Sequence, residues 1–524
     1  MGIYLNPSSI GFKRSLNSEI YVDKTGLIEK TNVLLDTEQK FICVSRPRRF
    51  GKSMAVNMLS AYYACGEDSS ALFDGLTISH TVSYRQHLNQ YNVIKVNMQD
   101  FLSMTHSMDE MLTMLQKYLS FDLLEQFEHI RFRDENNLIQ IMKDIYAKTN
   151  RSFIILVDEW DCLFREYQHD TAAQKQYLDF LRSWLKDKDY VALAYMTGIL
   201  PIKKYGTHSA LNMFTEYSMT DPGELAPFFG FTEQEVQELC PQYDMSYDKM
   251  KQWYDGYDLK GIQIYNPRSV VMSLSGHDFD SYWTKTETYE ALKKYIQMDM
   301  YNLKELVTRL IAGSSIEINP DKFQNDMTTF ASADDVLTLL VHLGYLTYDF
   351  DTCTVHIPNQ EVQKEFINCI EDGGWEPVMD AIRKSEELLA ATIRGEEETV
   401  ARMIENAHQE NTSILAYNDE NSLSCTINLA FYFAREYYTV IREFPGGKGF
   451  ADICFIPRKI HMDKPAAVIE LKWNKSAEGA IQQIKDKQYI EALKDYHGNL
   501  LLAGIDYDKK TKQHSCIIEK WNMS

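Results

Sequence analysis

The sequence predicts an α/β protein with a parallel sheet near its N-terminus, a helical middle region and a second α/β unit at its C-terminus. The chain has 524 residues, more than one hydrophobic core normally supports, so we expect several domains. Apolar, β-rich runs alternate with amphipathic stretches over residues 38–215, and this alternation returns after residue 385. Apolar strands separated by helices are typical of a parallel sheet with both faces covered.

The expected strands can be placed from their composition. In the first region they lie at residues 40–45, 91–98, 152–158 and 191–198. The middle region is rich in helical patterns and is expected to contain a winged-helix-like part near residues 325–358, which ends in a small β-hairpin. The last region reads as a helix, the strands "YTVIREF", "FADICFIP" and "AAVIELKW", a helix "SAEGAIQQIKDKQYIEAL" and a strand "NLLLAGIDYD". We therefore expect domains at 1–215, 216–384 and 385–524.

Composition excludes several classes of protein. The formal net charge of -21 argues against a general polyanion binder, so any contact with nucleic acid has to come from local basic patches. No apolar run is long enough to cross a bilayer, and the first residues lack the pattern of a signal peptide or a lipid anchor. The nine cysteines are scattered, with no Cys-x-x-Cys pair. We therefore expect a cytoplasmic protein with reduced thiols and no membrane partner.

A first chemical pattern lies after the first expected strand. Gly51, Lys52 and Ser53 stand between this strand and a helix, which is the context that a phosphate-binding loop requires. In such a loop the lysine reaches the β- and γ-phosphates and the serine binds Mg²⁺. The pattern is incomplete because Arg46 occupies the place of the first glycine, and a helix start with a surface lysine is the alternative.

A second pattern supports the first. The buried strand "SFIILVD" ends in Asp158 and is followed by Glu159, as in a Walker B element. Asp158 is expected to hold Mg²⁺ through water and Glu159 to polarise the attacking water. Thr197 ends the next strand, at the sheet edge where a residue that senses the γ-phosphate belongs. An acidic helix cap is the alternative for the two carboxylates.

A third pattern lies near the C-terminus. Glu470 and Lys472 are two positions apart on an apolar strand and therefore share one face. Asp452 lies near the start of the preceding strand, which an antiparallel connection would bring beside the end of the next. Two adjacent carboxylates call for a cation, and hard oxygen ligands favour Mg²⁺ or Mn²⁺. A structural ion pair on an edge strand is the alternative.

Seven motifs occur in an order that resembles the AAA-ATPase-like family of bacterial and archaeal P-loop proteins. They are "YVDKTGLIEK" (21–30), "SRPRRFGKS" (45–53), "VDEWD" (157–161), "TGIL" (197–200), "FFGFTEQEV" (228–236), "WYDGYDLKGIQIYNPRSV" (253–270) and "LGYLTY" (343–348). Members of this family commonly carry a C-terminal nuclease domain of the PD-(D/E)XK superfamily. The resemblance implies a P-loop ATPase domain and a restriction-endonuclease-like domain, and it makes an arginine at position 46 acceptable.

The resemblance also implies site residues. For the nucleotide these are the loop and helix start together with two strand ends: Arg49, Phe50, Gly51, Lys52, Ser53, Met54, Asp158 and Thr197. For nuclease catalysis they are Asp452, Glu470 and Lys472, with Glu420 from the preceding helix and Gln483 from the following one. Glu443 is the substitute for Glu420, and Tyr489 is a companion of Gln483. Ala451 replaces the proline of the superfamily motif. The metal ligands expected at the two sites are Ser53, Asp158, Asp452 and Glu470.

These expectations combine into an ATP-hydrolysing P-loop protein fused to a Mg²⁺-dependent nuclease, with Mn²⁺ as a possible substitute at the nuclease site. DNA is expected as substrate in preference to RNA, the ATP state is expected to gate cleavage, and a homo-oligomer is left open. Two other readings remain. One is a nucleotide-switched scaffold whose nuclease-like domain is a docking module, and the other is a regulator that binds DNA through the region near 325–358.

Overall fold

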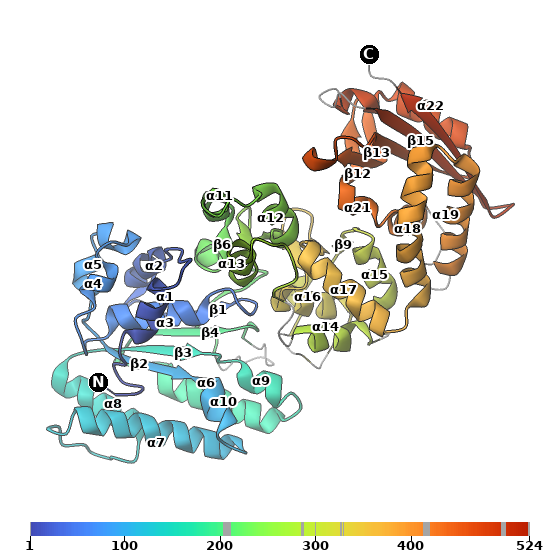
Figure 1. The fold of residues 1–524 in the computed structure, drawn as a ribbon. Helices are drawn as coiled ribbons and strands as arrows, with labels where there is room; N and C mark the ends of the chain where they lie inside the picture. Colours follow the sequence, from blue (N-terminus) through green and yellow to red (C-terminus); the bar gives the residue numbers. More distant parts are fainter. Residues whose placement is uncertain are drawn as a thin grey trace. The chain divides into compact units, whose positions relative to one another are not determined.

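The computed structural model divides the chain into two compact units (Figure 1). It describes residues 2–202, 211–283, 288–298, 300–324, 327, 330–411, 420–493 and 499–521, and for residues 288–291, 411, 420, 421 and 491 it describes the backbone only. Unit 1 comprises residues 1–288 and 317–362, and unit 2 comprises residues 289–316 and 363–524. None of the described helices combines the length and the hydropathy that a membrane-spanning helix needs.

The sheet of unit 1 is parallel throughout, as the sequence predicts. Its strand order is β2-β3-β4-β1-β5. The strands are β1 (Phe41–Ser45), β2 (Asn92–Asn97), β3 (Phe153–Asp158), β4 (Val191–Gly198) and β5 (Thr215–Tyr217). The first four lie within a residue of their expected positions, and β5 was not expected. Every position of β1, β3 and β4 is buried, and the positions before the polar strand ends are nearly all apolar, which explains why these strands read as continuous apolar runs.

Helices cover both faces of this sheet (Figure 1). Ile154 and Leu156 of β3 pack against one set, and Phe153, Ile155 and Val157 pack against the other. The first set is α1 (Ile10–Leu16), α2 (Gly26–Leu34), α3 (Lys52–Tyr63), α4 (Ser70–Phe73) and α5 (Tyr84–His87). The second set is α6 (Met98–Ser103), α7 (Met108–Gln126), α8 (Leu138–Thr149), α9 (Cys162–Glu166) and α10 (Thr171–Leu185).

The rest of unit 1 is helical with two small antiparallel pieces. Its helices are α11 (Glu233–Gln242), α12 (Tyr247–Tyr254), α13 (Pro267–Gly276) and α16 (Ala333–Leu343). One small sheet joins β6 (Phe231–Thr232), β8 (Gln263–Tyr265) and β7 (Tyr257–Asp258) in that order. The expected hairpin is present after α16, where β10 (Thr347–Asp349) pairs antiparallel with β11 (Thr354–His356).

Unit 2 is built on a mixed sheet of β12 (Tyr438–Gly446), β13 (Gly449–Pro457), β14 (Ala466–Trp473), β15 (Leu500–Asp508) and β16 (Gln513–Trp521), in that order. All neighbours are antiparallel except β14 and β15, which are parallel because α22 (Ala477–Asp486) connects them. The sequence predicts the first four strands and α22, but not β16. The other helices are α14 (Thr288–Ile296), α15 (Leu303–Ile311), α17 (Gln360–Asp372), α18 (Glu376–Arg394), α19 (Glu397–Asn411), α20 (Glu420–Ala430) and α21 (Ala434–Tyr437).

Two buried histidines lie between α19 and the sheet of unit 2. The ring centres of His408 and His514 are 5.1 Å apart, and both rings contact Tyr507, His408 edge to face and His514 at a tilt. Burial lowers the pKa of His408 to about 4, and burial together with the neighbouring His408 lowers the pKa of His514 to about 3. The two side chains are therefore held in their neutral form by the packing of this layer.

This burial predicts a loss of stability in acid. The unfolded chain takes up protons near the ordinary histidine pKa of about 6.5, whereas the folded unit does so only near 3 to 4. Stability is thus complete above pH 7 and falls as the pH drops from 6.5, by up to about 1.4 kcal/mol per pH unit for each histidine. The substitution His514→Phe should reduce this slope, measured as hydrogen-exchange protection of α19 and β16 corrected for intrinsic rates.

A matched control is His461→Phe, which changes a partly exposed histidine of the same unit. It should keep the wild-type slope. An unchanged slope in His514→Phe would show that the buried pair does not cause the acid sensitivity.

Candidate functional site

The carboxyl ends of the central strands of unit 1 bring polar residues to one edge of the sheet. Ser45 at the end of β1 pairs with Gly198 of β4, and Asn97 of β2 pairs with Asp158 of β3. In open parallel sheets, ligands bind outside this edge. The loop from Arg46 to Gly51 and the start of α3 follow β1 directly. The edge therefore has the position of a ligand site.

The loop after β1 has the backbone of an anion-binding turn. Gly51 is the N-cap of α3 and has a left-handed backbone with φ 89°, and Arg49 is also left-handed with φ 71°. Lys52 begins the helix, and Ser53 and Met54 are exposed in its first turn. The free N–H groups of a helix start favour an anion at this position.

Lys52 is buried and bonded to its own loop. Its Nζ donates to the carbonyl oxygens of Arg46 at 2.8 Å and Pro47 at 3.0 Å. Burial lowers the pKa of Lys52, and the carboxylates of Glu159, Asp161 and Asp158 oppose that shift. The ammonium group is thus close to three acids, while its direct partners among the described residues are neutral carbonyls.

Arg46 anchors the loop to two strands. Its side chain is fully buried, and Nη1 donates to the carbonyls of Ser45 at 2.9 Å and Tyr217 at 2.8 Å. The guanidinium lies over the Phe229 ring, 5.7 Å from its centre. Burial lowers the pKa of Arg46 to about 10. This arginine fixes the loop against β1 and β5.

The acidic end of β3 faces the same edge. Asp158 is buried, and its Oδ1 accepts hydrogen bonds from the Thr197 hydroxyl and from the N–H of Glu159 at 3.1 Å. Glu159 has a left-handed backbone, φ 52°, and its carboxylate forms an ion pair with Arg165. Strain at a non-glycine residue is found preferentially at functional sites. The hydrogen bond from Thr197 joins the end of β4 to the acidic end of β3.

The sequence did not indicate two further charged residues, Asp161 and Arg165. Asp161 has no exposed surface, and its Oδ2 accepts from the N–H groups of Ile199 at 3.0 Å and Leu200 at 2.9 Å. Arg165 Nε lies 3.7 Å from the same oxygen. The spacing of four residues in a helix was the available signal, since it places the two side chains on one face. Together they fix the turn after β3 to the end of β4.

Three of the later motifs pack against the loop within unit 1. The Phe50 and Tyr257 rings meet edge to face at 5.3 Å, and Gly230 N–H donates to the Phe50 carbonyl. The Tyr257 hydroxyl donates to the Gly344 carbonyl at 2.7 Å. Trp283 Nε1 donates to the carbonyl of Arg48 at 3.2 Å. These contacts fix the backbone of the loop.

In unit 2, antiparallel pairing brings the predicted carboxylates together. Asp452 and Glu470 lie one position beyond the paired residues Ile453 and Ile469. Asp452 Oδ2 accepts from the N–H of Leu471 at 2.6 Å. Glu470 is 2% exposed. The end of β14 and the start of β13 therefore form one carboxylate pair.

Lys472 and Gln483 both donate to one oxygen of Glu470. Lys472 Nζ lies 2.8 Å from Oε1, and Gln483 of α22 donates its amide N–H to the same atom. Gln483 also lies 3.3 Å from the Tyr489 hydroxyl. Within the described part of the chain, the other oxygen of Glu470, Oε2, is buried and has no hydrogen-bond partner.

Burial and the charge of Asp452 raise the pKa of Glu470 to about 7, against the opposing effect of Lys472. A carboxylate in this state is what a divalent cation would satisfy, because the ion supplies charge and a partner for Oε2. The two carboxylates fit such an ion as a partial set. Among the described residues no three His, Cys, Asp or Glu side chains converge on one point.

The third predicted carboxylate is not determined. Glu420 begins α20, but its side chain lies outside the described residues. Glu443 lies on β12 opposite Asp452 of β13, between the pairs Arg442–Ile453 and Phe444–Ala451, and has a left-handed φ of 47°. It is exposed, and its kinked backbone interrupts the ladder at this point.

Sequence reasoning missed Arg442 and Asp506 near this pair. Arg442 lies on β12, donates to Ser314 at 2.5 Å and to Ser424 of α20 at 3.3 Å, and feels the charge of Asp452. Asp506 of β15 is buried beside Lys472 in the strand register and accepts from the Lys475 N–H at 3.0 Å. The signal in both cases was a charge on an otherwise apolar strand.

Comparison with known families identifies both regions. Residues 12–207 match a family model described as a predicted AAA-ATPase, and residues 419–518 match a model of the PD-(D/E)XK nuclease superfamily. Both matches agree with the resemblance drawn from the sequence motifs. The roles of individual residues stay predictions.

One curated relative is the uncharacterized protein in the vnfD 5' region of Azotobacter chroococcum mcd 1. It is 25% identical over 279 residues, and the match spans 51% of this chain and 51% of the relative. The chain thus covers about half the length of that relative.

Solved structures give weak likenesses. The ORC2 protein of Aeropyrum pernix, in ADPNP–ADP complexes, has a TM-score of 0.29 at 10% identity over 70% of this chain and 98% of its own. The replication initiator DnaA bound to AMPPCP and single-stranded DNA has a TM-score of 0.27 at 8% identity, over 72% and 94%. Scores this low support no inference about function.

The packing around the loop predicts a graded effect of two glycine substitutions. Gly344 and Gly261 have left-handed backbones of φ 88° and 85°. Alanine at either position costs about 1–2 kcal/mol for that backbone. At Gly344 its Cβ would also lie 2.8 Å from Pro47 Cβ, whereas at Gly261 nothing lies within 4 Å. Gly344→Ala should therefore lower the free energy of unfolding by about 1–3 kcal/mol more than Gly261→Ala does.

The measurement is urea denaturation of both variants, followed by tryptophan fluorescence. Equal midpoints for Gly344→Ala and Gly261→Ala would contradict the contact between Gly344 and the loop.

Proposed function

We propose that this chain, which joins a predicted AAA-ATPase domain at residues 12–207 to a PD-(D/E)XK nuclease superfamily domain at residues 419–518, is an ATP-hydrolysing, metal-dependent nuclease that cleaves DNA. The observation that carries the proposal is the Glu470 carboxylate. It is buried beside Asp452, bonded by Lys472 and Gln483 at one oxygen and left without a hydrogen-bond partner among the described residues at the other. A purely structural ion pair would satisfy both oxygens.

At the edge of the first sheet, the chain's own residues account for ATP binding. The N–H groups of the loop and of the α3 start receive the phosphates, and Lys52 exchanges its carbonyl partners for phosphate oxygens. Ser53 and Asp158 would hold Mg²⁺, which neutralises phosphate charge. Thr197 orients Asp158, and Glu159 orients the attacking water while Arg165 restrains its side chain.

In the nuclease domain, Asp452 and Glu470 would hold Mg²⁺ or Mn²⁺. That ion supplies an activated water and neutralises charge on the scissile phosphate. Gln483 fixes the direction of the Glu470 carboxylate, and Lys472 provides a positive charge for the reacting phosphate. Glu420 belongs to this set by analogy with the superfamily. We place the protein in the cytoplasm and favour DNA over RNA as its substrate.

Control of the nuclease by the ATP state is the finer part of the proposal. The presence of both domains in one chain supports it. Such control requires that ATP binds one conformation of the chain better than another, because only then can the nucleotide shift the conformational equilibrium. The scaffold alternative keeps nucleotide binding but assigns no cleavage to unit 2. The net charge of -21 favours that alternative, and the cleavage assay decides between them.

Loss of either carboxylate should abolish cleavage. Asp452→Asn and Glu470→Gln are expected to reduce DNA cleavage about 100-fold or more, because each removes charge needed at the transition state. The assay incubates plasmid and single-stranded DNA with Mg²⁺ or Mn²⁺, with and without ATP. Asp463→Asn, in the loop between β13 and β14, is the control and should cleave like wild type. If wild type and Asp452→Asn both fail to cleave DNA in every condition, the nuclease proposal is wrong and the scaffold alternative remains.

ATP turnover should depend on Lys52 and Glu159 in different ways. Lys52→Ala should lose both nucleotide binding and turnover, whereas Glu159→Gln should bind ATP, seen as a thermal shift, without hydrolysing it. Lys30→Ala breaks only a surface ion pair with Glu224 and should behave as wild type. Unchanged turnover in Lys52→Ala would contradict the assignment of the loop. A change in cleavage by Glu159→Gln at saturating ATP is the expected sign of gating.

A further inference from the structure

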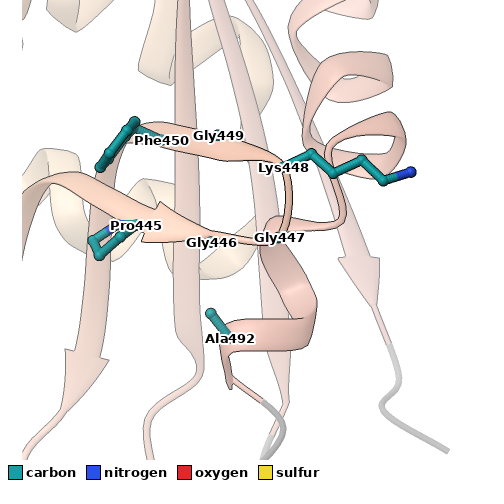
Figure 2. Close-up of a pocket in the computed structure, with 7 residues that line it drawn as sticks. All are labelled: Pro445, Gly446, Gly447, Lys448, Gly449, Phe450 and Ala492. Carbon is teal, nitrogen blue, oxygen red and sulfur yellow. The ribbon is translucent and has the colours of Figure 1, made fainter.

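The tip of the β12–β13 hairpin borders a hollow in unit 2. Pro445 pairs with Phe450 and Gly446 with Gly449 across the hairpin, and Gly447 and Lys448 form its turn. With Ala492 these residues line a hollow of about 650 Å³. Figure 2 shows the Pro445 and Phe450 rings on one side of the hairpin and the Lys448 side chain extending from the other.

Close backbone contacts fasten this tip to the segment after α22. Lys448 N–H donates to the carbonyl of Lys487 at 2.8 Å. Gly447 has φ 50°, and a Cβ there would lie 2.1 Å from the same carbonyl oxygen. A Cβ on Gly449 would lie 3.3 Å from the hydroxyl of Tyr489, which in turn meets Gln483. Since Gln483 donates to Glu470, two side chains, Tyr489 and Gln483, link the tip to the carboxylate pair.

The tip exposes an aromatic ring on its strand, and lysines lie at its turn and in the segment packed against it. Phe450 is 65% exposed, although it belongs to a strand whose neighbour Ala451 is fully buried. Lys448 and Lys487 are both exposed, and the aliphatic stem of Lys487 lies against Gly449. In a chain with a net charge of -21, the two lysines at this tip supply the local positive charge that a polyanion requires.

We propose that this tip, defined by Pro445–Phe450 and Lys487, stacks an unpaired DNA base on Phe450 while Lys448 and Lys487 contact the flanking phosphates. The proposal rests on the proposed nuclease function. Phe450 is two residues from Asp452, about 7 Å along an extended strand. That distance corresponds to about two stacked nucleotides. The stacked base therefore lies within about two nucleotides of the scissile phosphate and sets which bond reaches the carboxylates.

The test measures binding of the full chain to a fluorescein-labelled single-stranded oligonucleotide by anisotropy. Ca²⁺ replaces Mg²⁺ to neutralise the carboxylates, and gels verify that the oligonucleotide stays intact. Loss of one base stack weakens binding by about five- to 100-fold, so Phe450→Ala should show a loss in this range and Phe450→Trp should not. The double variant Lys448→Ala, Lys487→Ala should lower the slope of log affinity against log salt by about 1.4.

The matched control is Ile460→Ala, which removes an apolar side chain of the same unit with 64% exposure. It should bind like wild type. A second series replaces single bases of the oligonucleotide by abasic sites. The effect of Phe450→Ala should vanish at one position only, because a lost stack cannot be lost twice, whereas a misfolded hairpin would weaken binding to every oligonucleotide.

The outcomes separate this proposal from the proposed function. Equal affinity of Phe450→Ala and Ile460→Ala overturns the stacking surface, and cleavage by wild type would still stand. Binding that depends on Phe450 with no cleavage supports the surface and overturns the nuclease. A wild-type chain that binds no oligonucleotide overturns the surface as well.

Discussion

The burial of the Glu470 carboxylate is the constraint on which the arrangement of the C-terminal site depends. A buried carboxylate destabilises a fold unless it is paired and hydrogen-bonded. Lys472 and Gln483 supply that compensation at Oε1, and Tyr489 engages Gln483 in turn. The compensation is incomplete, because Asp452 adds a second negative charge and raises the pKa of Glu470 to about 7. The fold thus tolerates a carboxylate that is only half neutralised, as expected where a cation completes the balance.

At the edge of the parallel sheet, buried charges are compensated by hydrogen bonds to the main chain. Asp161 is buried with two backbone N–H donors, and Lys52 with two backbone carbonyls. These partners cannot leave the site, so a ligand has to replace the bonds of Lys52 with stronger ones. Charge-assisted bonds to phosphate oxygens meet that condition, whereas neutral ligands do not. The geometry around Lys52 therefore favours phosphorylated ligands over other molecules of similar size.

Much of this fold could be predicted because the pattern of apolar residues that marks a strand is local in the sequence. The four apolar runs of unit 1 and the alternation that places Glu470 and Lys472 on one face depend only on neighbouring residues. Strand β16 was missed because "KQHSCIIEKW" mixes polar and apolar residues, as edge strands do. Asp161 was missed because its hydrogen-bond donors, the N–H groups of Ile199 and Leu200, follow β4, which no local pattern reveals. The contact of Gln483 with Glu470 joins α22 to β14 and is tertiary, although both residues stood out in the sequence.

Arg46 shows why a departure from a motif can be neutral for the backbone and still have a physical effect. Glycine is favoured where φ is positive, and in this loop the left-handed residues are Arg49 and Gly51, not Arg46. Position 46 is therefore free to carry a side chain, and the arginine uses it to bind the carbonyls of Ser45 and Tyr217. With a pKa of about 10 it remains a cation at neutral pH. It therefore adds a fixed positive charge behind the loop, which favours an anion at the loop more than a glycine at position 46 would.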